Sequence, residues 1–173
     1  MGRHLRIHRT GGEPADVSGF GGVVTCNFIV NRQLAQTNSM VVDYAWWNQK
    51  NDPGVLHRHE VDEVVFIVSG ECIHVGEGDH HRVGAGDFVY VEAGTWHGIY
   101  NVSTSVPVEI VAFFGGVGSY EEVGHEVCPP DLEAAYLANL PDFLEGNPRQ
   151  PAAEHTVPAS GDNTDQDHAT STN

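Results

Sequence analysis

The chain has 173 residues, of which 40% are hydrophobic, and it carries 24 acidic against 8 basic side chains, a formal net charge of −16. This length predicts one domain with room for a terminal extension. A protein of this negative charge repels phosphate groups, so we do not expect it to bind nucleic acid or anionic membrane surfaces. No apolar run reaches the roughly 18–20 residues that cross a bilayer, and the basic N-terminal stretch lacks the apolar core of a secretory signal, so we expect a cytoplasmic protein.

The cysteine and histidine contents have different implications. The three cysteines, Cys26, Cys72 and Cys128, lie far apart and form no CxxC pair. They therefore predict buried, reduced thiols rather than a disulfide framework or a structural zinc site. Histidine, with eleven residues, is unusually frequent. This abundance directs attention to the spacing of possible metal ligands.

The first part of the chain divides into an N-terminal arm, residues 1–22, and a β-rich region, residues 23–118. The arm either adds an edge strand or is loose. In the β-rich region, segments rich in β-branched and aromatic residues alternate with turn sequences. These segments are 23–30, 39–47, 63–70, 71–75, 87–91 and 106–114. Many short strands without helical periodicity predict an all-β sandwich or barrel.

Two further segments follow the β-rich region. In residues 119–146, apolar side chains recur at helical spacing, and Pro130 with Asp131 supplies the chemistry of a helix start, which predicts a short helix. Residues 147–173 have almost no bulky apolar side chains and are rich in Pro, Ser, Thr, Asn and Asp. This composition predicts a disordered tail, in which His155 and His168 are solvated.

Four residues have the types and spacing of metal ligands. His57 and His59 stand at positions i and i+2, so an extended backbone directs both imidazoles to one face. Glu63 follows four residues later, and a bend brings its carboxylate beside them, while His97 follows a tight turn further along the chain. Three imidazoles and one carboxylate, with remaining positions open, suit one divalent iron, manganese, nickel, copper or zinc ion.

The carboxylate ligand has two competitors in the sequence. Strand parity directs Glu60 away from the histidine pair, whereas parity alone does not dismiss Asp62. The spacing from the histidines selects Glu63. This residue also opens an apolar strand and shares its inward direction with Val65 and Ile67.

These two stretches resemble the two motifs of the cupin superfamily, over roughly residues 40–115. The matching positions are His57, His59, Glu63 and Gly70 in the first motif and Gly86, Gly94, His97 and Asn101 in the second. Glu92 replaces a proline of the family pattern, and Gly54 lies closer to His57 than in that pattern. The resemblance implies a double-stranded β-helix, or jelly-roll barrel, that places one divalent metal ion, most often iron, on the four ligands.

The resemblance also implies a largely apolar cavity beside the metal. The candidates for its lining are Tyr44, Trp46, Ile99 and Phe113, with Trp47 and Phe114 as further aromatic residues. Ile99 is the best founded of them, because it shares the strand parity of His97. Ordinary core packing is the alternative for each aromatic residue. The remaining histidines His74, His80, His81 and His125 are interpreted as surface or core residues.

The function expected from these residues is metal-dependent catalysis on a small organic molecule. An iron dioxygenase is the first hypothesis, because open positions on the metal let substrate and dioxygen coordinate side by side. In it, Glu63 serves as ligand and as possible proton acceptor. A redox-neutral cyclase or isomerase, with a metal such as zinc acting as a Lewis acid, is the second hypothesis. A non-catalytic metal- or ligand-binding protein is the third. A homodimer is the expected assembly.

Overall fold

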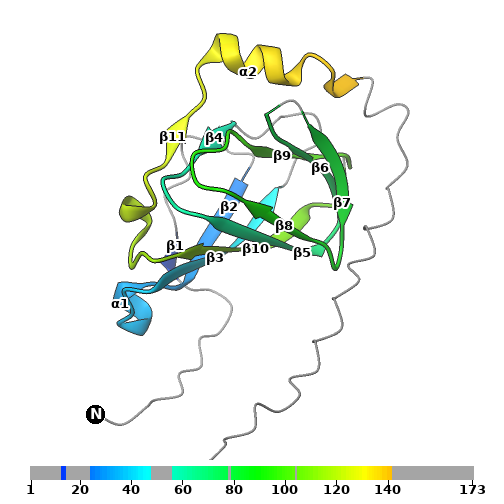
Figure 1. Ribbon diagram of the computed structural model, residues 1–173. Helices are drawn as coiled ribbons and strands as arrows, with labels where there is room; N and C mark the ends of the chain where they lie inside the picture. The colour runs from blue at the N-terminus through cyan, green and yellow to red at the C-terminus, as the bar shows by residue number, and fades with distance from the viewer. Residues whose placement is uncertain (1–12, 15–23, 48–55, 78, 104, 142–173) are drawn as a thin grey trace, which may run out of the picture.

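The computed structural model describes residues 13–14, 24–47, 56–77, 79–103 and 105–141. The predicted tail, residues 147–173 with His155 and His168, lies outside the described residues. The same holds for most of the predicted arm, residues 1–22, and for Gly54. In the described part of the chain, one large β-sheet faces two smaller ones across a shared apolar interior (Figure 1). The predicted all-β class is confirmed.

The larger sheet is fully antiparallel and holds every predicted strand except residues 71–75. Its spatial order is β1-β2-β3-β10-β5-β8. These strands are β1 (Glu13–Pro14), β2 (Val24–Val30), β3 (Met40–Trp47), β10 (Val108–Gly115), β5 (Glu63–Ser69) and β8 (Phe88–Val91). The edge strand β1 belongs to the predicted arm and pairs with Phe28 and Asn27 of β2.

Two smaller sheets cover the other side of the interior. One has the order β7-β6-β9, and the other pairs β11 with β4. These strands are β7 (His80–Gly84), β6 (Glu71–Val75), β9 (Gly98–Asn101), β11 (Glu126–Val127) and β4 (His57–Arg58). Cys72 of β6 and Ile99 of β9 pack in the same buried cluster as Val41 and Phe114 of the larger sheet. The core therefore lies between the sheets.

Short helical segments among the described residues border the barrel. They are α1 (Arg32–Ala35), the 3-10 helix η2 (Tyr120–Val123) and α2 (Pro130–Leu137). The last one confirms the predicted helix, with Pro130 at its first turn and Asp131 beside it. Its residues Leu132 and Tyr136 pack on a second buried cluster around Ile73. No helix in the described ranges is long and apolar enough to cross a membrane.

Strand alternation decides which side chains reach the interior. Along β10, Val108, Ile110, Ala112 and Phe114 are buried, and the residues between them are more exposed. At one end of the interior, the side chain of Asn101 is fully buried. Its Nδ2 donates to the carbonyl oxygens of Trp47 at 2.9 Å and Val106 at 3.0 Å, which ties β9 to the ends of β3 and β10.

We expect Asn101→Ala to lower the free energy of unfolding by about 2–4 kcal/mol, because the buried carbonyl oxygen of Trp47 and the part-buried one of Val106 lose their donor. Chemical denaturation of the purified variant measures this change. Ser105→Ala in the neighbouring exposed turn is the matched control and should stay within about 0.5 kcal/mol of the wild type. An unchanged denaturation midpoint for Asn101→Ala would show that this amide does not hold the strand ends together.

Candidate metal centre

The two motifs meet through a pair of backbone hydrogen bonds. The N–H of His57 donates to the carbonyl of His97, and the N–H of His97 donates to the carbonyl of His57, both at 2.9 Å. Residues that exchange both bonds stand directly opposite each other in an antiparallel pair, with side chains on the same face. The two imidazole centroids accordingly lie 4.5 Å apart.

His59 completes a group of three buried imidazoles. Its carbonyl accepts a 2.7 Å hydrogen bond from the N–H of Gly94, which fixes the chain two residues beyond His57. One ring nitrogen from each of His57, His59 and His97 lies within 4.8 Å of the other two. This group can hold a metal ion.

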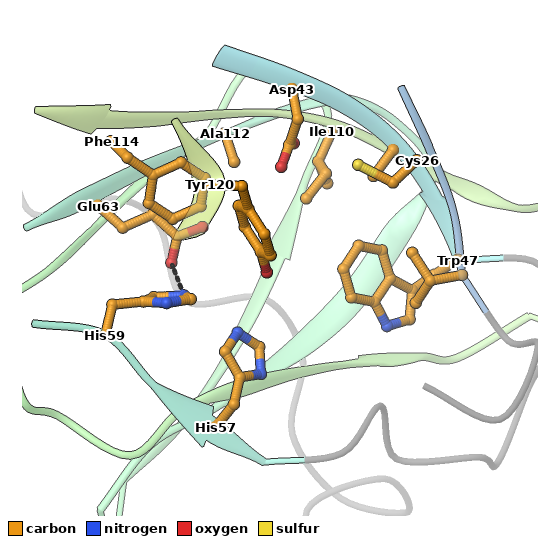
Figure 2. Close-up of a pocket in the computed structure, with 12 residues that line it drawn as sticks. Cys26, Asp43, Trp47, His57, His59, Glu63, Ile110, Ala112, Phe114 and Tyr120 are labelled. Carbon is orange, nitrogen blue, oxygen red and sulfur yellow. Dashed lines mark ion pairs between the residues drawn. The ribbon is translucent and has the colours of Figure 1, made fainter. Parts of the chain in front are cut away.

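Glu63 is the carboxylate that points into the group (Figure 2). Its Oε2 lies 2.9 Å from Nε2 of His97 and 3.7 Å from Nε2 of His59. Asp62 instead accepts a hydrogen bond from the N–H of Ala93 at 3.0 Å, and Glu60 is exposed. Of the three neighbouring acids, only Glu63 therefore lies close to the imidazoles, and it is also the acid that the sequence spacing predicted as the ligand.

The contact between Glu63 and His97 outweighs the effect of burial on both groups. Burial alone raises the pKa of the carboxyl and lowers the pKa of the imidazole. The hydrogen bond and the opposite charges reverse both effects, so the pKa of Glu63 is lowered and that of His97 is raised. Nδ1 of His97 lies 2.9 Å from the carbonyl of Thr95, which accepts its proton and directs Nε2 toward Glu63.

His59 shows that the group fits a cation. Burial lowers the pKa of this imidazole to about 4, so it is neutral at pH 7 and has a lone pair to donate. Neither of its ring nitrogens has a hydrogen-bond partner among the described residues. Apart from their mutual contact, Glu63 Oε2 and His97 Nε2 also lack one. Buried polar atoms without partners are costly, and a divalent cation would satisfy one ring nitrogen of His59 together with Glu63 Oε2 and His97 Nε2.

Two histidines outside the motifs lie against this group. The ring of His74, in β6, stacks on His97 with centroids 5.8 Å apart and planes at 6°. The ring of His125 stacks on His57 at 4.8 Å and 28°. Burial lowers the pKa of His74 to about 3, so it stays neutral beside the other imidazoles. The sequence has no signal for these two positions, because the pairings β6–β9 and β4–β11 bring them there.

The ligand group opens onto a small cavity of about 40 Å³. Roughly 10–15 Å³ suffices for one water molecule on the same scale, so the cavity holds a few waters or the reacting end of a small molecule. His57, His59 and Glu63 form one side of it (Figure 2). The rest of the lining includes Cys26, Asp43, Trp47, Ile110, Phe114 and Tyr120.

Two aromatic residues that line the cavity, Trp47 and Phe114, each follow directly in the sequence after a residue that was predicted to line it. Tyr44 lies on the outward face of β3, where its hydroxyl donates to Glu109 at 2.6 Å. Trp46 lies on the same face and meets the Tyr44 ring edge to face at 4.4 Å. The inward position of β3 belongs to Trp47, because strand alternation places Tyr44 and Trp46 on the opposite face.

The same displacement by one residue holds on β10. Phe113 is 40% exposed, whereas Phe114 is buried and lines the cavity. Ile99 is buried as expected, but it packs in the apolar core rather than among the residues that line the cavity. The predicted lining is therefore corrected to Trp47 and Phe114 in place of Tyr44, Trp46 and Phe113.

Sequence reasoning missed the most unusual group in the cavity, the carboxyl of Asp43. This side chain is only 6% exposed, and its Oδ1 has no hydrogen-bond partner. Burial, and then the negative charge of Glu63, raises its pKa to about 7. Hydrogen bonds from the Cys26 thiol and the backbone of Ala112 lower the pKa by less than burial raises it.

We expect Asp43 to contribute a stability to the metal-free protein that is lost as pH rises from 4 to 7. Its folded-state pKa, about 7, lies above the ordinary value of 3.8, so the folded state binds the proton more tightly in this interval. Asp43→Asn has no proton to lose. At about 1.4 kcal/mol per pKa unit, the variant should gain up to about 4 kcal/mol relative to the wild type between these pH values.

Denaturation curves at a series of pH values test this expectation. Glu109→Gln removes a carboxylate from the outward face of the neighbouring strand and should follow the wild-type curve. A difference between Asp43→Asn and wild type that stays constant from pH 4 to 8 would contradict the expectation.

The middle of the chain matches a known family. Residues 49–114 match the family model described as a cupin domain. Among solved structures, a cupin 2 domain-containing protein from Halorhodospira halophila has a TM-score of 0.58 at 18% identity, covering 73% of this chain and 85% of that chain. The polyketide cyclase RemF from Streptomyces resistomycificus has a TM-score of 0.56 at 18% identity, covering 73% and 83%.

A third solved structure, a predicted oxalate decarboxylase from Thermotoga maritima, has a TM-score of 0.55 at 20% identity and covers 65% of this chain and 100% of that chain. A search of curated proteins gives no match. At these identities the solved structures are similar in fold alone. Taken with the matched domain and the fold, they show that the chain belongs to the cupin superfamily.

Proposed function

We propose that this protein is a metal-dependent enzyme that acts on a small organic molecule. One observation carries the proposal: three buried imidazoles and a buried carboxylate gather beside a cavity that His57, His59 and Glu63 line. His57, His59, His97 and Glu63 would hold one divalent ion there. Bound to them, the ion would supply Lewis-acid or redox chemistry to a substrate oxygen.

An enzyme fits this geometry better than a structural metal site does. Structural sites enclose the ion with protein ligands on every side, whereas catalytic sites keep a position open. Here the cavity adjoins His57, His59 and Glu63 and extends toward Trp47 and Phe114. A substrate can therefore approach the ion with its apolar part against aromatic side chains. A non-catalytic binding protein remains the outcome if no turnover is found.

Within this class, the cavity favours redox-neutral chemistry over the iron dioxygenase. The four ligand-type side chains and the open positions on the metal suit a dioxygenase and a redox-neutral cyclase or isomerase equally well, so they do not distinguish the two reactions. The cavity also contains Asp43 and Tyr120, which can exchange or donate protons during isomerisation or ring closure. The fold shared with the cyclase RemF is in keeping with this chemistry. The small-molecule substrate, the homodimer and the cytoplasmic location expected from the sequence stay predictions.

We expect about one divalent ion per chain after purification without chelator, and none in the double variant His57→Ala/His59→Ala, because two neutral donors are lost. Elemental analysis of the purified proteins measures this. His81→Ala, an exposed histidine on β7, is the matched control and should keep its metal. Full metal occupancy in the double variant would refute the site.

The same samples separate the two chemistries. Turnover of a substrate panel by the zinc-loaded protein, without oxygen uptake, would support the redox-neutral reaction. Turnover that requires iron and consumes dioxygen would support the dioxygenase instead.

We expect Glu63→Gln to bind metal more weakly, because the amide keeps the size of the side chain but removes its charge. Asp62→Asn and Glu60→Gln remove the same charge from the neighbouring acids, which point away from the cluster. Metal titration of the three variants should show a loss of affinity of at least tenfold for Glu63→Gln alone. A comparable loss in Asp62→Asn would mean that the carboxylate ligand is misassigned.

A further inference from the structure

The cavity has two chemically different ends. The metal-ligating side chains His57, His59 and Glu63 lie at one end, while Asp43 reaches in from β3, two strands away from Glu63 in the larger sheet (Figure 2). Tyr120 lies between them, with its hydroxyl directed toward the histidines (Figure 2). A small molecule in this space would therefore meet the ligand group with one part and the carboxyl of Asp43 with another.

The position of Asp43 is unfavourable for a purely structural residue. It stands in the middle of β3, paired with Ala112 of β10 and flanked by Val42 and Tyr44. An apolar side chain at such a site has no charge to desolvate, whereas burial of a carboxyl lowers stability unless the carboxyl is fully hydrogen-bonded. Its Oδ1 has no such bond, and the residue lines the cavity. The unpartnered oxygen is thus available to a ligand.

We propose that Asp43 is a catalytic residue that takes a proton from, and returns it to, a small carbonyl compound held in this cavity. The assignment rests on the proposed metal-dependent function and names its proton-transfer group. In the forward step, a C–H bond beside the carbonyl breaks, its proton moves to the Asp43 carboxylate, and the electron pair stays on the substrate as an enolate. Return of the proton to a different atom completes an isomerisation, so no further reactant is needed.

The other titratable groups on this wall fit the role less well. Burial raises the pKa of the Cys26 thiol and of the Tyr120 phenol, so both stay protonated at neutral pH. They can donate a hydrogen bond but cannot accept a proton. Asp43, with a pKa raised to about 7, has both forms available near neutrality. A cation on Glu63 would weaken the electrostatic part of this shift, while the larger part, which comes from burial, remains.

Solvent-deuterium exchange tests the assignment without knowledge of the natural substrate. The zinc-loaded protein is incubated in heavy water with three small enolisable probes, pyruvate, 2-oxobutanoate and acetoacetate, and loss of the C–H signals is followed by proton NMR. We expect the wild type to exchange at least one probe faster than zinc in buffer does. Asp43→Asn should slow this exchange by at least about 100-fold, in the usual range for loss of a general base. Glu109→Gln should exchange at the wild-type rate.

Two further measurements separate this assignment from the metal site. Zinc content by elemental analysis should be equal in wild type and Asp43→Asn. Quenching of tryptophan fluorescence, to which Trp47 in the lining contributes, should show that the metal-free variant still binds the exchanged probe within about threefold of wild type. A variant that loses its zinc or its probe binding would overturn the catalytic assignment in favour of a structural role.

The remaining outcomes are also decisive. Exchange at the wild-type rate by zinc-loaded Asp43→Asn would overturn the assignment and leave the proposed metal-dependent function intact. Exchange of none of the three probes by the zinc-loaded wild type would overturn it as well. A wild-type protein that binds no divalent metal would instead refute the proposed function itself.

Discussion

The candidate site depends on one pair of backbone hydrogen bonds, those that His57 and His97 exchange. They join two motifs that are far apart in the chain and set the register of their side chains. Once these residues stand opposite each other, both imidazoles must share a face, and His59 follows on the same face two residues later. The three imidazoles are therefore positioned by main-chain geometry, before any metal contributes.

That geometry also buries the negative charge of Glu63, which either a proton on a neighbouring imidazole or a bound cation can balance. Glu63 is buried beside three imidazoles, and it raises the pKa of His97 while its own pKa is lowered. Without metal, a proton on His97 balances the buried carboxylate. A divalent ion would displace that proton, so metal and protons compete for one site, and metal affinity should rise with pH. The neutral His59 and His74 add no positive charge that would oppose the ion.

Much of this arrangement could be predicted from the sequence because it follows from local rules. The spacing of the histidines fixes a common face, and the turn glycines have defined backbone roles. Gly70 has a positive φ of 85°, and a Cβ there would lie 2.8 Å from the carbonyl oxygen of Pro107. The strand segments were likewise recognisable from their β-branched and aromatic composition. Their pairing order was not, and neither were His74 and His125, which reach the site only through that pairing.

The lining of the cavity shows why the remainder could not be predicted. In β3 both faces carry apolar or aromatic residues, so the sequence does not reveal which face is inward. The single acid in the strand, Asp43, would ordinarily lie on the solvent face. Strand alternation would then place Tyr44 and Trp46 on the buried face. The structure has the opposite phase, with Asp43 and Trp47 inward.

An exception of this kind is informative in itself. Natural sequences agree with local patterning wherever stability alone is selected, and departures from it concentrate at functional sites. The departure at Asp43 weakens the fold above pH 4, since burial penalises the ionised carboxyl. A carboxyl that lowers stability, faces a cavity and shares it with metal-ligating side chains is better explained by chemistry performed in that cavity than by packing.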